Sequence, residues 1–163
     1  MNNCKKIATP APEDLFKVDE SVVKLGSVKA KVFHTIIVKA LYVSKRARPD
    51  TSLAIAFLTT RVREPDEDDW RKLRHLIVYL KSTCELPLVL GARNTGVLHW
   101  YVDASFAVHP NMQGHTGGVL TLGTGAPVVT LTKQKLNTRS STISEVVAVD
   151  DMIPQILWTR LFM

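Results

Sequence analysis

Two carboxylates, 42 positions apart, are the side chains best suited to chemistry in this sequence. Asp103 ends an apolar segment that resembles a strand, and Glu145 falls in the first turn of a helix expected further along. If that helix packs across the strand, the two acids come together. Magnesium prefers oxygen ligands, and two-metal hydrolases use such acids to activate water. The spacing thus favours a hydrolytic metal site, although turn and helix-cap roles explain each acid equally well.

Other polar clusters give weaker signals. His109 and His115 flank a glycine-containing turn without a third nearby soft ligand, so we expect solvated loop histidines and no zinc site. The hydroxyls of 140–142 lack a nucleophile motif and are typical of a helix cap.

A basic segment follows the last expected strand. Lys133, Lys135 and Arg139 alternate with polar residues, a composition that fits phosphate contacts and fits a solubilising connection equally well. The net charge of +6 and the sequence pI near 9.5 allow a polyanionic partner.

The first half of the chain has helical periodicity. Residues 1–27 read as an extended lead-in without a stable element. Apolar positions predict a helix from Ser27 that ends before Pro49, and Asp50 could cap a second helix. Pro65 and Asp66 precede a third, whose later basic residues we expect to form a solvated face.

The second half changes to β-branched residues, threonines and glycines after Gly91, so we place a boundary near residue 93. Residues 97–105, 118–122 and 128–133 predict an antiparallel meander. A helix capped by Ser141 or Thr142 follows, and Pro154 is expected to break it. The fold class is therefore α+β, a helical segment followed by a three-stranded meander plus helix.

Composition excludes several protein classes. With 163 residues, 45% hydrophobic and 22% charged, the chain suits one ordinary domain or two small units. Cys4 and Cys84 form no disulfide or zinc framework, which fits a reducing, intracellular environment. The polar N-terminus resembles neither a signal nor an anchor, and glycines interrupt the uncharged stretch 104–132, so no membrane segment is expected.

Read in order, these segments resemble the part of copia-type retrotransposon Pol polyproteins where reverse transcriptase leads into ribonuclease H. The matching motifs are Leu41-Tyr42 with Lys45-Arg46-Ala47-Arg48-Pro49-Asp50, Asp69-Trp70-Arg71-Lys72-Leu73 with Tyr79-Leu80-Lys81, Tyr101-Val102-Asp103-Ala104-Ser105, His115-Thr116-Gly117-Gly118, and Lys133-Gln134-Lys135 through Ser140-Ser141-Thr142 to Glu145.

The resemblance implies that 28–93 is the helical C-terminal end of reverse transcriptase and 94–163 a truncated N-terminal half of a ribonuclease H-like domain. Asp103 and Glu145 would be catalytic carboxylates that hold Mg²⁺ in a two-ion site. The partner would be an RNA:DNA hybrid, contacted by Ser105, Lys133, Lys135 and Arg139. The polymerase's own aspartate pair is absent, so DNA synthesis is not predicted.

The sequence also departs from the family pattern. Ile143 and Ser144 replace the Glu-Ala of Ser-Ser-Thr-Glu-Ala-Glu, and a third carboxylate would lie beyond Met163. On a helix, Asp150 lies about 140° from Glu145 and Asp151 about 120° the other way, so neither replaces it. We therefore expect an incomplete metal site and weak or absent hydrolysis.

Two consequences of this interpretation stay open. The alternative function is a non-catalytic nucleic-acid-binding or structural remnant that uses basic surfaces around Arg46, Arg48, Lys133 and Lys135. In addition, the strand at 98–102 would be an open sheet edge. Such an edge predicts low stability, or association through it or with missing Pol segments.

Overall fold

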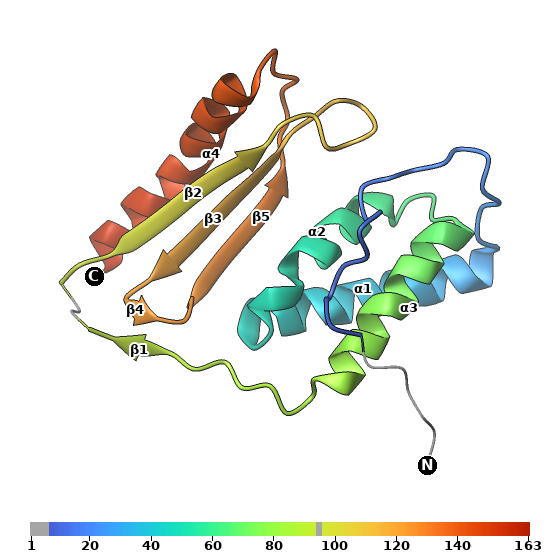
Figure 1. The fold of residues 1–163 in the computed structure, drawn as a ribbon, viewed down its shortest axis with the longest axis horizontal. Helices are drawn as coiled ribbons and strands as arrows, with labels where there is room; N and C mark the ends of the chain where they lie inside the picture. The colour runs from blue at the N-terminus through green and yellow to red at the C-terminus, as the bar shows by residue number, and fades with distance from the viewer. Residues whose placement is uncertain (1–6, 94–95) are drawn as a thin grey trace. The chain divides into compact units, whose positions relative to one another are not determined.

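The computed structural model describes residues 7–93 and 96–163, which fall into two compact units, Met1–Pro87 and Leu88–Met163. Figure 1 shows helices in the first unit and a sheet with one long helix in the second. Among the described residues, no helix has the length and apolarity needed to cross a membrane. Cys84 is exposed and free, and Cys4 lies outside the described residues.

The first unit is helical, as the periodicity predicts. Its elements are α1 (Ser27–Arg46), the 3-10 turn η1 (Pro49–Thr51), α2 (Ser52–Arg61) and α3 (Glu67–Ser82). The core consists of apolar side chains from all three α-helices, with less than a tenth of their surface exposed: Phe33, Ile37, Ala40, Ala54, Ile55, Phe57, Leu58, Leu73 and Leu76.

The described part of the lead-in, residues 7–26, contains no helix or strand, but it contributes to this core. Leu15 is buried, and the ring of Phe16 packs edge-on against Phe57 at 5.3 Å between centroids. The ammonium of Lys72 donates a 2.6 Å hydrogen bond to the backbone carbonyl of Lys17. Residues before α1 are therefore part of the tertiary structure of this unit.

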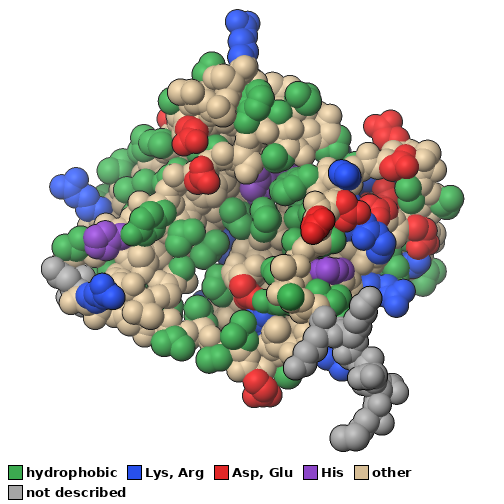
Figure 2. All heavy atoms as spheres, in the orientation of Figure 1, with side chains coloured by type: hydrophobic (Ala, Val, Ile, Leu, Met, Phe, Trp, Pro, Cys, Tyr) green, Lys and Arg blue, Asp and Glu red, His purple; other side chains and the backbone are tan. Residues whose placement is uncertain are grey.

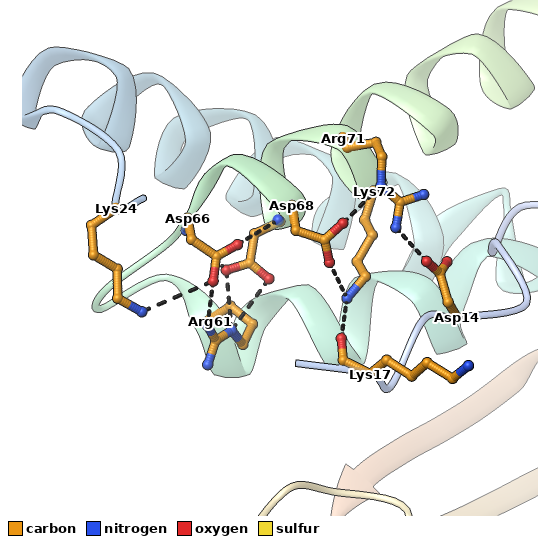
Figure 3. A network of polar contacts seen from close by, with 9 residues as sticks. Asp14, Lys17, Lys24, Arg61, Asp66, Asp68, Arg71 and Lys72 are labelled. Carbon is orange, nitrogen blue, oxygen red and sulfur yellow. Dashed lines mark hydrogen bonds and ion pairs between the residues drawn. The ribbon is translucent and has the colours of Figure 1, made fainter. Parts of the chain in front are cut away.

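Asp66 starts α3, as predicted, through a capping box with Asp69: each carboxylate accepts the other residue's backbone N–H. Arg61 at the end of α2 pairs with both acids, at 2.9 Å and 3.1 Å (Figure 3). Burial raises the pKa of Asp69, although Arg61 opposes that rise. Local sequence and a tertiary ion pair thus fix the same helix start.

Three expectations about charged residues in this unit are wrong. Asp50 does not cap α2; it lies in η1, where its carboxylate accepts hydrogen bonds from Arg48 and the Tyr79 hydroxyl. Arg48 is buried in that cluster and cannot belong to an open basic surface. Lys72 is likewise buried, paired with Asp68, so the basic residues of α3 do not all form a solvated face.

The second unit contains the predicted antiparallel meander. Strands β2 (His99–Ser105), β3 (His115–Thr121) and β5 (Val128–Lys133) pair in the order β2-β3-β5, so β2 has one unpaired edge within this sheet. The middle strand begins three residues earlier than predicted. Short strands β1 (Gly91–Ala92) and β4 (Gly123–Thr124) pair separately.

Helix α4 (Ser141–Phe162) follows the sheet and lies along β2 and β3 (Figure 1). Its cap is Ser140, one residue before the expected positions. The predicted break at Pro154 is wrong, because the helix continues through it. A proline removes a single backbone hydrogen bond, and contacts of Met152 and Thr159 with the sheet hold the helix on both sides of it.

Candidate functional site

One face of the three-stranded sheet is covered by α4. The indole of Trp100 on β2 donates to the Thr159 hydroxyl at 3.2 Å, and the Thr116 hydroxyl on β3 donates to Asp151 at 2.9 Å. Gly118 lies against Met152, which occupies the space where a Cβ would stand. The strand register places these three sheet residues on the same face.

The other face, which we call the open face, carries the alternate residues. The row Asp103–Gly117–Leu131 lies on it, and the row Ser105–His115–Lys133 lies next to it toward the end of β2. Asp103 and Ser105 are exposed, and the Asp103 carboxylate accepts the backbone N–H of Ala104 at 2.8 Å. The pleat therefore directs Asp103 away from the face that α4 covers.

Glu145 lies in the second layer of this unit, on α4. Its neighbour Ser144 is completely buried against the sheet, while Glu145 is exposed. The helix thus presents Glu145 to solvent on its own side of the sheet. Although both predicted carboxylates are accessible, no hydrogen bond or ion pair described here joins them.

This donor set does not fit the two-ion magnesium site that the resemblance implies. Such a site needs several oxygen ligands around each ion. The described residues contain no group of three or more His, Cys, Asp or Glu placed to hold a metal. Asp103 and Glu145 project from different layers, and we derive no reaction step through magnesium.

The predicted basic residues lie in and after the last strand of the sheet. Lys133 and Ser105 flank His115 in the last row, and the exposed Lys135 and Arg139 lie in the connection that leads from this end to α4. Burial lowers the pKa of Lys133. One cationic residue and one hydroxyl residue therefore belong to the row next to Asp103, and two further cationic residues follow along the chain.

A pocket of about 250 Å³ lies at the opposite end of the open face. It is lined by Arg93, His99, Tyr101, Thr121, Leu122 and Gly123. Tyr101 is 64% exposed, and the described contacts give the Arg93 guanidinium no ion pair. An exposed aromatic ring beside a cation suits a nucleobase and its phosphate. Sequence reasoning missed both residues as binding candidates: Tyr101 was noted only as part of the motif around Asp103, and Arg93 lies outside the charged motifs.

The two histidines are not solvated, contrary to the sequence expectation. The loop between β2 and β3 folds back so that His109 and His115 are 3% and 4% exposed, with Nε2 of His109 3.0 Å from Nδ1 of His115. Burial lowers both pKa values to about 4, and the nearby Lys133 contributes. The pair is neutral at pH 7 and fastens the loop over the sheet.

A buried amide anchors the first turn of α4. Gln134, 1% exposed, donates to the Ser144 carbonyl at 2.8 Å and to the Thr116 hydroxyl at 3.2 Å, and the Ser144 hydroxyl donates back to its side-chain oxygen at 2.8 Å. Ser144 stands where the resembled motif has alanine. This polar network fixes the position of Ser144 and therefore of its neighbour Glu145. From the sequence, only the polar segment after β5 could be recognised, and its contacts with α4 could not be predicted.

Comparison with known proteins finds similarity to transposon proteins. The chain is 26% identical, along its full length, to the retrovirus-related Pol polyprotein from transposon TNT 1-94 of Nicotiana tabacum. It is 32% identical over 75% of its length to the one from transposon RE2 of Arabidopsis thaliana, and 29% identical over 63% to a putative transposon Ty5-1 protein of Saccharomyces cerevisiae.

These relatives are long. The chain spans 13% of the tobacco polyprotein, 8% of the Arabidopsis polyprotein and 33% of the yeast protein. No protein-family model and no solved structure matches it. The chain is thus distantly similar, along its full length, to copia-type retrotransposon Pol polyproteins, and it is a Pol-related chain.

Proposed function

We propose that the second unit is a nucleic-acid-binding unit of ribonuclease H lineage that binds an RNA:DNA hybrid with little or no hydrolysis. The observation that carries this proposal is the composition of the open face. Cationic side chains lie at both of its ends, Arg93 at one and Lys133, Lys135 and Arg139 at the other. Phosphate contacts of this kind dominate affinity for nucleic acids.

The aromatic side chain supports the same ligand class. Tyr101 offers an exposed ring on the open face, between the pocket and the row of Asp103. Stacking of one base on such a ring is worth about 1–3 kcal/mol and tolerates any base. The net charge of +6 favours association with a polyanion. A nucleic-acid partner implies an intracellular location.

Binding is tested by fluorescence anisotropy with a labelled RNA:DNA hybrid at several salt concentrations. The double variant Lys135→Glu/Arg139→Glu should weaken binding about tenfold or more and flatten the salt dependence, because two phosphate contacts are lost. A matched control, Lys31→Glu/Lys39→Glu, makes the same charge change at exposed positions of α1 in the other unit. Equal loss in both variants, or no binding by the unaltered chain, contradicts the proposal.

Tyr101→Ala separates base stacking from charge. We expect it to weaken binding about fivefold to a hundredfold without changing the salt slope. The control is Tyr42→Ala, which removes an equally exposed ring from α1. If Tyr42→Ala weakens binding as much as Tyr101→Ala does, the open face is not the binding surface.

Hydrolysis of the RNA strand is the second candidate, and the accessibility of both Asp103 and Glu145 favours it. Because Asp103 on β2 and Glu145 on α4 project from different layers of this unit, we expect binding without cleavage. Incubation of the hybrid with the chain and magnesium tests this candidate, with Asp103→Asn and Glu145→Gln as variants. Cleavage that disappears in both variants establishes the enzyme; binding without cleavage supports the main proposal.

The unpaired edge of β2 belongs to the same proposal. An exposed edge strand can pair with another strand, so we expect this unit to accept a strand from another Pol segment. A proline at the outward-facing backbone of β2 would block such pairing. If the proline variant still binds the added strand as tightly as the unaltered chain does, this part of the proposal is contradicted.

A further inference from the structure

Helix α4 has an apolar stripe on the side that the sheet does not cover. We call this set the outer stripe; its members are 43% to 87% exposed: Val146, Val149, Ile153, Leu157 and Leu161. At about 100° per residue they span about 120° of the helix circumference. Figure 2 shows hydrophobic side chains exposed over the region that α4 occupies in Figure 1.

The inner side of the same helix already has its partner. Ala148, Met152 and Thr159 are at most 5% exposed, and the sheet covers them. A helix that is apolar on both sides normally buries both. An exposed apolar stripe along several turns is typical of a protein interface.

Charges beside the outer stripe indicate what covers it. Asp150 and Arg160 lie near the stripe, and the described contacts include no ion pair for either residue. They are placed symmetrically about Gln155. In an antiparallel pair of α4 helices centred there, Arg160 of each copy is level with Asp150 of the other.

The apolar residues follow the same symmetry. In this register Ile153 faces Leu157 of the second copy, and Val149 faces Leu161. A parallel pair would instead place Asp150 against Asp150 and Arg160 against Arg160. A two-fold interface repeats each contact. The same antiparallel register therefore pairs opposite charges and also brings apolar side chains together.

We propose that the outer stripe binds the outer stripe of a second copy of this chain, giving an antiparallel α4–α4 homodimer. A 22-residue helix is about 33 Å long. A pair of such helices buries less than the roughly 1,600 Å² of a standard interface. Interfaces below the standard size are typical of weak, transient association, so dimerisation is measured at micromolar concentrations. This interface does not depend on the open face and is independent of the proposed nucleic-acid binding.

The experiment is sedimentation equilibrium of the full chain, freed of nucleic acid, from about 1 to about 100 µM. Asp150→Arg and Arg160→Asp should each weaken dimerisation about tenfold or more, because each places like charges together. The combined variant Asp150→Arg/Arg160→Asp should recover the original dissociation constant within about threefold. Circular dichroism of each variant checks that it is folded.

Apolar variants complete the test. Ile153→Asp should abolish the dimer, whereas Val38→Asp, at an exposed apolar position of α1, should leave it unchanged. Three outcomes overturn the inference: a monomeric chain over the whole range, a combined variant weaker than either single one, or a dimer that persists in folded Ile153→Asp. The last outcome would assign association to another surface, such as the edge of β2.

Discussion

Acidification should unfold the second unit selectively, through the buried pair His109–His115. Both imidazoles titrate at about 4 in the folded chain and at 6.5 in the unfolded chain. Below pH 6.5 the unfolded chain therefore binds more protons than the folded one. The stabilisation is complete above pH 6.5 and is lost as the pH falls toward 4.

The size of the effect follows from these values. Between pH 7 and pH 5 the free energy of unfolding should fall by about 2 kcal/mol for each histidine, or about 4 kcal/mol for the pair. A unit of this size has about 4 to 11 kcal/mol in total. The positive charge of Lys133 beside the pair acts in the same direction, since it disfavours the imidazolium forms.

Urea unfolding monitored by tryptophan fluorescence measures this change. Trp70→Phe removes the tryptophan of the first unit, so that Trp100 and Trp158 report on the second. The double variant His109→Gln/His115→Gln should lose most of the pH dependence, whereas the exposed His99→Gln should keep it. Parallel pH dependence in the unaltered chain and the double variant would refute the reasoning.

A second measurement uses only the unaltered chain, so it tests the reasoning even if the double variant does not fold. The imidazole proton resonances of the unaltered folded chain should titrate with midpoints near 4 for His109 and His115. Midpoints near 6.5 would show that the two imidazole rings are accessible to solvent. The predicted loss of stability of the second unit at low pH would then be refuted.

Three further changes test the packing of each unit. Gln134→Ala should lower the stability of the second unit by about 2 kcal/mol in urea unfolding, because it leaves buried partners without their amide. Asp66→Ala should destabilise the first unit by about 2 kcal/mol, measured through Trp70 fluorescence, since it removes a helix cap and a partner of Arg61. Gly118→Ala should cost about 1–3 kcal/mol because its Cβ meets Met152. In the double variant Gly118→Ala/Met152→Ala the measured cost should be at least about 1 kcal/mol less than the sum of the single ones.

Local signals in the sequence predicted the elements well. The start of α3 was predictable because Pro65 and Asp66 precede three acids and an amphipathic stripe, all within a few residues. The meander was predictable because its strands alternate with glycine-rich turns. The predicted end of a helix at Pro154 was wrong because tertiary contacts of α4 with the sheet outweigh one lost hydrogen bond.

Burial of polar side chains was not predictable in the same way. Arg48 and Lys72 are charged residues of the kind normally found in solvent, and each is buried with a hydrogen-bond partner far away in the sequence. His109 and His115 are buried against each other across the loop between β2 and β3. For the candidate site, the sequence predicted Asp103 at the end of a strand and the basic residues after the last strand. It could not predict that the Asp103 side chain points away from α4, because a shift of one residue in the strand register moves a side chain to the opposite face of the sheet.

The contact between Lys72 and the carbonyl of Lys17 has a practical consequence for anyone who shortens this chain. Trimming to the first helix would remove the carbonyl oxygen that accepts a hydrogen bond from the buried Lys72 ammonium, and it would remove the Phe16 ring that packs against Phe57. The trimmed product should therefore be prone to precipitate, even with every helix intact. Preparations of the helical part alone need to retain the segment that contains Leu15, Phe16 and Lys17.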